Sequence, residues 1–118
     1  MTFLTYLRER LCRGAKEHLL VIFCDRQGRY LEDAEMGWGT SHSIHLNIAQ
    51  LFRRALSIDA ASMVLAHNHP SGSCHPSEDD IEATRKLVSA GSLLGFEIKD
   101  HIIVTQKMAY SMRAGGQL

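Results

Sequence analysis

One stretch of this chain is apolar at almost every position, from Ala60 to Ala66, and it leads directly into His67. A helix or strand with one face in solvent shows polar residues at regular intervals, whereas a strand covered on both faces needs none. The stretch is also far shorter than the roughly 18 to 20 residues that span a bilayer. It therefore predicts the central strand of a sheet that has other layers packed on both sides.

The rest of the chain divides into segments with helical or alternating periodicity. They are a helix that starts at residue 3 and ends before 13–14, a hairpin of strands 17–24 and 29–36 around a turn at 25–28, a break at 37–40, a helix from residue 48 capped by Asn47, the central strand, a helix that opens at 77–80, a strand at 96–105 and a short strand at 110–112. Helices and strands alternate, which predicts an α/β fold with helices flanking a mixed sheet. At 118 residues the chain has the size of a single domain, 1–118.

Composition and charge exclude several classes of protein. With 45% hydrophobic and 22% charged residues, the chain resembles globular proteins rather than disordered or fibrous ones. Thirteen basic residues balance thirteen acidic ones, so no overall positive charge is available to hold nucleic acid. The three cysteines are an odd number without C-x-x-C spacing and predict free thiols, and the charged N-terminus has no secretory signal. We therefore expect a cytoplasmic location and no membrane contact.

The residues with the clearest chemical meaning follow the central strand. His67 and His69 are two apart, and alternate side chains of an extended chain point to the same side, so both imidazoles can reach one ion. The loop after them is rich in Pro, Ser and Gly, and the third helix can bring Asp80 back to the same point. Two imidazoles and one carboxylate suit Zn²⁺ and leave its fourth position open to water, as in catalytic zinc sites. On residue type alone, Asp79 competes with Asp80 for this role.

Hydrolysis at such a site needs a proton carrier and a group that stabilises the oxyanion. Zinc lowers the pKa of a bound water to about 7, and a carboxylate then transfers its proton to the leaving amine. Glu17, at the start of the first strand, is the candidate for this transfer. Ser77 can donate its hydroxyl to the oxyanion, and Ser77 to Asp80 also fits a capping box that opens a helix. Four other histidines are interpreted as ordinary polar residues: His42, His45, His75 and His101.

This segment resembles the JAMM metalloprotease signature, in which a distant Glu is followed by His-x-His, seven residues, Ser, two residues and Asp. The stretch His-Asn-His-Pro-Ser-Gly, followed by Pro-Ser-x-x-Asp and Thr84, is more specifically similar to the RadC proteins of bacteria. Further matching segments begin at Glu17, Gly39, Arg54 and Asp100, so the resemblance covers nearly the whole chain.

The resemblance implies both a fold and a function. The implied fold is the MPN (JAB) domain, a mixed sheet flanked by helices that is related in architecture to cytidine deaminases. The implied function is a zinc-dependent metallohydrolase that cleaves peptide or isopeptide bonds of an unidentified substrate, with DNA repair attached to the family by its name. In this chain the Zn²⁺ ligands would be His67, His69 and Asp80, the acid/base Glu17, and the oxyanion helper Ser77.

The chain departs from the family pattern in two ways. RadC-like chains have Pro-Arg-Glu before the second helix, where this chain has Ile48-Ala-Gln50; if that position carried the proton, the chain would be inactive. Family members also carry an N-terminal helix-hairpin-helix region associated with DNA, which these 118 residues do not contain. The alternative function is a metal-binding module without catalysis, associated with DNA repair or mobile elements. A nucleobase deaminase, by contrast, needs His-x-Glu and Pro-Cys-x-x-C, and the sequence has neither.

Overall fold

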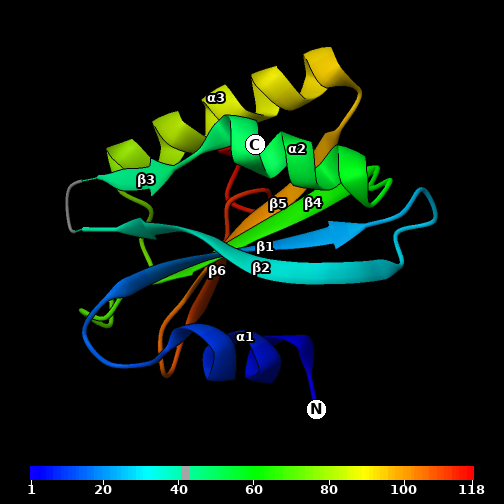
Figure 1. Ribbon diagram of the computed structural model, residues 1–118. Coiled ribbons are helices and arrows are strands. Elements are labelled where there is room, and N and C mark those ends of the chain that lie inside the picture. Colours follow the sequence, from blue (N-terminus) through cyan, green and yellow to red (C-terminus); the bar gives the residue numbers. More distant parts are fainter. Residues whose placement is uncertain (41–42) are drawn as a thin grey trace.

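The computed structural model of the chain describes residues 1–40 and 43–118, and within those ranges it contains three helices and six strands (Figure 1). None of the helices in these ranges is long and apolar enough to cross a membrane. In chain order the elements are α1 (Phe3–Leu11), β1 (Glu17–Cys24), β2 (Tyr30–Gly39), β3 (Ile44–Leu46), α2 (Ile48–Ser57), β4 (Ser62–Asn68), α3 (Glu78–Leu94), β5 (Glu97–Val104) and β6 (Ala109–Ser111).

The strands form one sheet in the order β3-β2-β1-β4-β5-β6. β4 and β5 run parallel, whereas every other pair of neighbours is antiparallel. Parallel neighbours need a long crossover connection, which α3 provides between β4 and β5. The predicted α/β class with a mixed sheet is therefore confirmed, and the apolar run that predicted a central strand forms most of β4.

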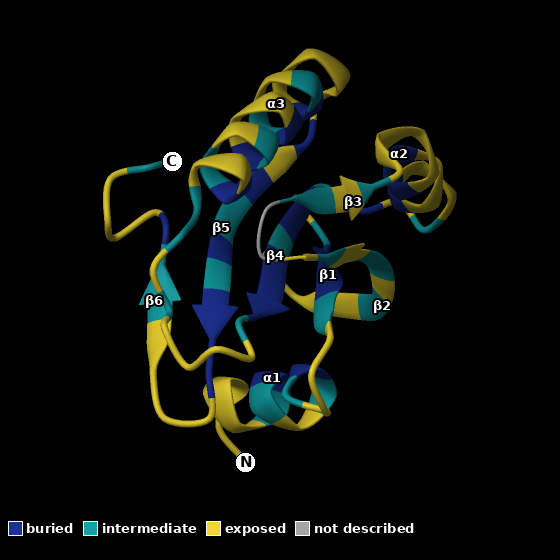
Figure 2. Cartoon of the chain, turned by 90° about the vertical axis from the view of Figure 1, so that its left-hand side faces the viewer, coloured by how far each residue is buried: buried dark blue, intermediate teal, exposed yellow. Residues whose placement is uncertain are grey.

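Helices cover both faces of this sheet, with α2 and α3 on one side and α1 on the other (Figure 1). Successive side chains of a strand point to opposite faces, so each central strand contributes to two cores. On β1, Phe23 faces the core beneath α2 and α3, while Leu20 faces Leu7 of α1. Both β1 and β4 are buried along most of their length (Figure 2). Burial on two faces explains why neither strand alternates polar with apolar residues.

The predicted helix starts agree with the structure. Asn47 caps α2, and Ser77 and Asp80 form the predicted capping box at the start of α3. The central strand begins at Ser62, two residues later than predicted, because the Ala60 N–H still donates to a carbonyl at the end of α2. The strand then continues through His67 and Asn68, so the first histidine belongs to the strand itself.

The predicted break at 37–40 is wrong. β2 continues to Gly39, and the short strand β3, which was not predicted, pairs with its end. Both glycines allow a close approach rather than a turn. A Cβ on Gly37 would lie 2.5 Å from the His45 carbonyl oxygen, and one on Gly39 would lie 3.1 Å from the Glu17 carboxylate. Glycine inside a strand often marks such an approach, and here it leaves room for the Glu17 side chain.

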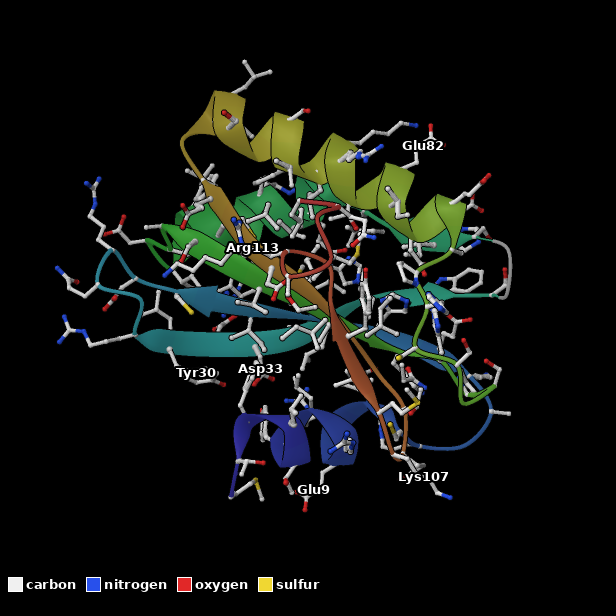
Figure 3. All side chains as sticks on the ribbon, turned by 180° about the vertical axis from the view of Figure 1, so that it is seen from behind. Glu9, Tyr30, Asp33, Glu82, Lys107 and Arg113 are labelled. Carbon is white, nitrogen blue, oxygen red and sulfur yellow. The ribbon has the colours of Figure 1, made fainter. Side chains whose placement is uncertain are left out.

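A buried carboxylate fastens α1 to the sheet. Asp33 projects from β2 towards α1 (Figure 3), with 3% of its side chain exposed. It accepts hydrogen bonds from the Tyr6 hydroxyl and the Arg10 guanidinium of α1, and from the Tyr30 hydroxyl at 2.9 Å. α1 is followed directly by the loop that leads into Glu17, so this anchor also fixes where β1 begins.

Candidate metal centre

Two histidine side chains meet where β4 ends. His67 lies in β4 on the face covered by α3, next to the buried Leu65, two residues earlier. His69 follows directly, and its backbone N–H donates to the Val104 carbonyl of β5 at 3.1 Å, which prolongs the path of the strand. The two Nε2 atoms lie 2.9 Å apart. The structure thus brings together the pair that the His-x-His spacing predicted.

The third predicted ligand reaches this pair from the start of α3. In the capping box, Asp80 Oδ2 accepts a hydrogen bond from the Ser77 N–H at 2.8 Å. The same oxygen lies 3.2 Å from His69 Nε2 and 3.4 Å from His67 Nε2. Asp79 is exposed and lines a different cavity. The structure therefore places Asp80, and not Asp79, beside the histidines.

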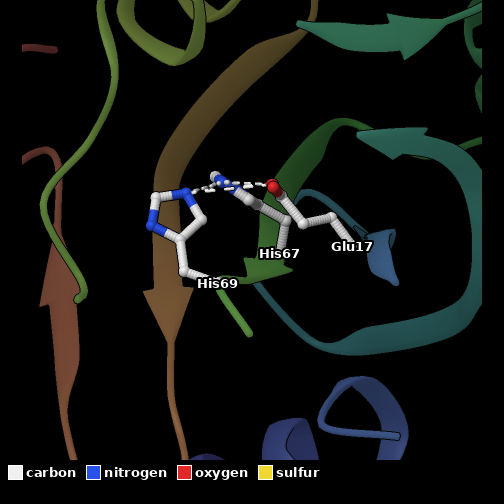
Figure 4. Close-up of side chains that lie close together, drawn as sticks. All are labelled: Glu17, His67 and His69. Atoms are coloured by element: carbon white, nitrogen blue, oxygen red, sulfur yellow. Dashed lines mark hydrogen bonds and ion pairs between the residues drawn. The ribbon is translucent and has the colours of Figure 1, made fainter. Parts of the chain in front are cut away.

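Glu17 also points towards these two imidazole rings (Figure 4). It is the first residue of β1, and its Oε1 lies 4.0 Å from His67 Nε2 and 3.9 Å from His69 Nε2. One ligand atom from each of Glu17, His67 and His69 falls within 4.8 Å of the others, so these three residues alone also form a candidate metal-binding set. Two carboxylates thus face the same pair of nitrogens.

The distances distinguish the two carboxylates. With bonds of about 2.0–2.1 Å, the ligand atoms of a tetrahedral zinc site lie about 3.3–3.4 Å from one another. The spacings of 2.9, 3.2 and 3.4 Å among His67, His69 and Asp80 are close to this edge length. Glu17 lies further from both nitrogens, at 3.9–4.0 Å, which suits a group that faces the fourth position rather than fills it. The donor set therefore fits zinc.

The charges in the centre shift one another's pKa values. Burial by itself would raise the pKa of Asp80, but hydrogen bonds with His67 and His69 hold it far below its usual value. Burial would lower the pKa of His69, and Asp80 together with the Ser73 carbonyl raises it overall. In His67 burial prevails, and the pKa is lowered. Burial raises the pKa of Glu17. The shift is in the direction of neutral pH, and a proton acceptor works best when its pKa is close to the working pH.

A cavity of about 470 Å³ opens onto the centre. Ser77 lines it, and its Oγ accepts a hydrogen bond from the Asp80 N–H at 3.0 Å, so the hydroxyl hydrogen is still able to donate elsewhere. The exposed His75 also contributes to the wall. The remaining lining residues include Ala15, Lys16, Glu17, Gly39, Thr40, His69, Pro70, Ser71, Ser73 and Asp80.

Gln50, at the position where the family pattern has a carboxylate, lies outside this cavity. It is exposed in the first turn of α2, where its N–H donates to the Asn47 side chain. It lines a separate, shallow depression with Trp38, whose ring stacks on that of His45 at 3.9 Å. Among the described residues, Glu17 and Asp80 are thus the carboxylates that meet the histidine pair.

Two residues that the sequence did not single out support the centre. Asn68 follows His67 and precedes His69 in the sequence, and it is buried. Its side chain accepts a hydrogen bond from the His18 N–H at 2.7 Å and donates one to the Lys16 carbonyl at 2.9 Å. It therefore holds the backbone on both sides of Glu17. His101, interpreted from the sequence as an ordinary polar residue, is buried and lies 2.6 Å from His67 Nδ1. One indication of His101 was present in the sequence: it lies in the segment 100–104, which resembles the family. The resemblance assigned no function to that segment.

Among the described residues, the remaining histidines and the cysteines take no part in the cluster. His45 stacks on Trp38, and His42 lies outside the described residues. The cysteines are free, as their odd number predicted: Cys12, Cys24 and Cys74.

Comparison with known families gives the geometry a context. A family model described as a RadC-like JAB domain matches residues 1–117. The chain belongs to the RadC-like JAB domain family. The predicted family and its MPN (JAB) fold are thereby confirmed.

Relatives of this RadC-like JAB domain are longer proteins. A UPF0758 protein of Syntrophomonas wolfei subsp. wolfei is 41% identical over 101 residues, which are 86% of the chain and 43% of that relative. A UPF0758 protein of Rubrobacter xylanophilus is 37% identical over 112 residues, which are 95% of the chain and 49% of that relative. The chain thus spans about half the length of these curated relatives, and their names state no activity.

Proposed function

We propose that this RadC-like JAB domain is a zinc-dependent metallohydrolase that cleaves peptide or isopeptide bonds. One observation carries the proposal: three ligand atoms, from His67, His69 and Asp80, lie 2.9–3.4 Å apart, and the Glu17 carboxylate faces them. JAB domains include metalloproteases. A zinc ion held by these ligands would supply Lewis-acid chemistry, which polarises a carbonyl and acidifies water.

Glu17 would carry the proton in this reaction. Its position beside the two nitrogens lets it accept a proton from the attacking water and pass it to the leaving amine. Its burial raises the pKa, so the carboxylate holds that proton more firmly than an exposed glutamate would. Gly39 lies beside the carboxylate, and a Cβ at this position would lie only 3.1 Å from it.

Ser77 would stabilise the oxyanion. Its oxygen is already engaged as the acceptor of the helix cap, and the hydroxyl hydrogen is available to a substrate oxygen in the cavity. Replacement of Ser77 by Ala removes the cap as well, at a cost of about 1 kcal/mol. Ser77→Asp keeps a capping acceptor and, when ionised, has no hydrogen to donate, so it separates the two roles: if its turnover equals that of the wild type, the oxyanion role is wrong.

The test is a comparison of two isosteric variants at known zinc content. Glu17→Gln and Gln50→Glu are each loaded with zinc, assayed for metal by mass spectrometry, and incubated with a peptide library and isopeptide-linked peptides. We expect Glu17→Gln to keep its zinc and lose at least about 100-fold in rate, the lower end of what acid/base groups contribute. Gln50→Glu should leave the rate unchanged, and His69→Ala should lose the metal.

Two results would decide against Glu17 as the proton carrier, and a third would decide against hydrolysis itself. Full activity in Glu17→Gln would remove the assigned proton carrier, and activity that requires Gln50→Glu would place that carrier at position 50. Stoichiometric zinc without hydrolysis, together with retention on DNA that weakens with salt, would instead favour a non-catalytic metal-binding module.

A further inference from the structure

A chain of buried polar contacts joins two of the proposed ligands behind the metal centre. His67 Nδ1 lies 2.6 Å from Nε2 of His101 on β5. Nδ1 of His101 lies 2.7 Å from the hydroxyl oxygen of Thr84 on α3, and that oxygen lies 2.6 Å from the backbone carbonyl oxygen of Asp80. Each of the four residues is at most 3% exposed, so solvent does not compete for these contacts.

Each contact needs one hydrogen, and its donor can be deduced step by step. A carbonyl cannot donate, so the Thr84 hydroxyl donates to Asp80. The sulfur of Met112, 3.9 Å from the same hydroxyl, is a more distant and weaker acceptor. The Thr84 oxygen therefore accepts from His101, which must carry a proton on Nδ1. The Nε2 of a neutral His101 is then bare, and it accepts from His67 Nδ1–H.

We infer that Thr84 and His101 are positioning residues, which hold His67 as its Nδ1–H tautomer and keep its Nε2 free for a metal. The identity of the ion rests on the proposed function, whereas the tautomer is a property of the folded chain. Partners of this kind fix the tautomer and the ring orientation of metal-binding histidines. The contacts also close a ring, because the Asp80 carboxylate lies 3.4 Å from the same His67 Nε2.

The opposite direction of donation conflicts with the geometry. If Thr84 donated to His101, two oxygens would face each other at 2.6 Å with no hydrogen between them. A second proton on His101 would leave a charged ring that is only 1% exposed, and its two contacts, the Thr84 hydroxyl and the neutral His67 ring, carry no opposite charge. His69 reaches the same tautomer by a shorter route, since its Nδ1 lies 2.8 Å from the Ser73 carbonyl, which can only accept. Both histidines therefore present a bare Nε2 when they bind a metal.

The test uses two variants of Thr84. Thr84→Val keeps the shape of the side chain and removes the hydroxyl, whereas Thr84→Ser keeps the hydroxyl and serves as the control. Long-range ¹H–¹⁵N correlation spectra of the metal-free protein show which imidazole nitrogens carry a proton. Zinc affinity is measured by competition with a chelator, and thermal unfolding verifies that each variant is folded.

We expect the proton of His101 to move to Nε2 in Thr84→Val, because Nδ1 then faces no acceptor. The proton of His67 is thereby displaced to its own Nε2, and zinc binding weakens about 10–100-fold, the range found for such partners. Thr84→Ser should match the wild type in both readouts. If Thr84→Val retains His67 Nδ1–H, or binds zinc within about threefold of the wild type, the inference is overturned.

A second pair of variants guards against a folding defect. His101→Gln offers an amide oxygen that can accept from His67, whereas His101→Phe offers none, so only the second should lose the tautomer and the zinc affinity. None of these readouts needs a substrate. Zinc binding with the expected tautomers but no hydrolysis would contradict the proposed function and support the positioning role. Hydrolysis by the wild type, together with unchanged tautomers and zinc affinity in Thr84→Val, would support the proposed function and contradict the positioning role.

Discussion

Replacement of Asn68 by Ala should release the strand that carries Glu17. The backbone pairing of β1 with β4 ends at Leu19 and His67, and the Asn68 side chain extends it by binding the backbone at His18 and Lys16. With 2% of its surface exposed, Asn68 makes both hydrogen bonds away from solvent. No other side chain in the described residues is shown to bond these two backbone groups.

The loss in stability can be worked out from the two bonds. An ordinary hydrogen bond contributes about 0.5–1.5 kcal/mol net, whereas its loss costs about 1–3 kcal/mol when it leaves a buried group without a partner. Lys16 is exposed, so water can replace the Asn68 amide at its carbonyl and only the net value of that bond is lost. His18 is half-buried, and its N–H loses the Asn68 oxygen as its acceptor, so this group bears the larger cost. Together the two losses come to about 1.5–4.5 kcal/mol. Because domains are stable by about 5–15 kcal/mol, the variant should still fold.

Urea unfolding of the wild type and Asn68→Ala measures this difference. Asn68→Asp provides a matched control, since it retains the acceptor for His18 and loses only the donor to Lys16, with a carboxylate placed against that carbonyl. In zinc-loaded Asn68→Ala, we also expect turnover to fall about tenfold or more, because a misplaced catalytic group reduces the rate steeply. A stability change below about 0.5 kcal/mol, or unchanged turnover, would show that Asn68 does not hold the start of β1 in place.

Two further predictions concern α1 and Gly39. The hydrogen bonds from Tyr6, Arg10 and Tyr30 outweigh the burial of Asp33 and lower its pKa. The stability that these bonds confer is therefore present above the pKa of Asp33 in the unfolded chain, about 3.9, and it is lost as the pH falls through the lower pKa of Asp33 in the folded protein. Asp33→Asn should therefore destabilise the protein by about 1–3 kcal/mol at pH 7 and progressively less below pH 4; a gap in urea midpoint that is constant with pH would contradict this. Gly39→Ala would place a Cβ 3.1 Å from the Glu17 carboxylate, so hydrolysis should fall while the zinc affinity stays unchanged, and equal losses in both would point to general disruption.

Local geometry made part of the centre predictable. His67 and His69 share one side of an extended chain because side chains alternate along a strand, whatever surrounds them. Ser77 and Asp80 meet because a capping box joins positions three apart. The apolar run likewise predicted a buried strand, because burial on two faces leaves its mark within the strand itself. These features depend on neighbours along the sequence, and the sequence alone was sufficient for them.

The glycines of β2 show where local patterns mislead. Glycine usually interrupts a strand, which is why a break at 37–40 was predicted. Here the smallest residue is needed because the His45 backbone and the Glu17 side chain come close to the strand. Those neighbours belong to other segments, so no pattern within β2 could indicate them.

Strand pairing decided the rest of the centre. Glu17 reaches the histidines because β1 pairs with β4 in a register that aligns Leu19 with His67, and family resemblance, rather than any local pattern, had pointed to it. His101 depends on a finer detail. β5 shifts register between its pairs with Met63 and Val64, and the extra residue places His101 opposite Leu65, on the face that holds His67. A shift of one residue exchanges the two faces of a strand, and its position is set by contacts between strands that only the folded chain brings together.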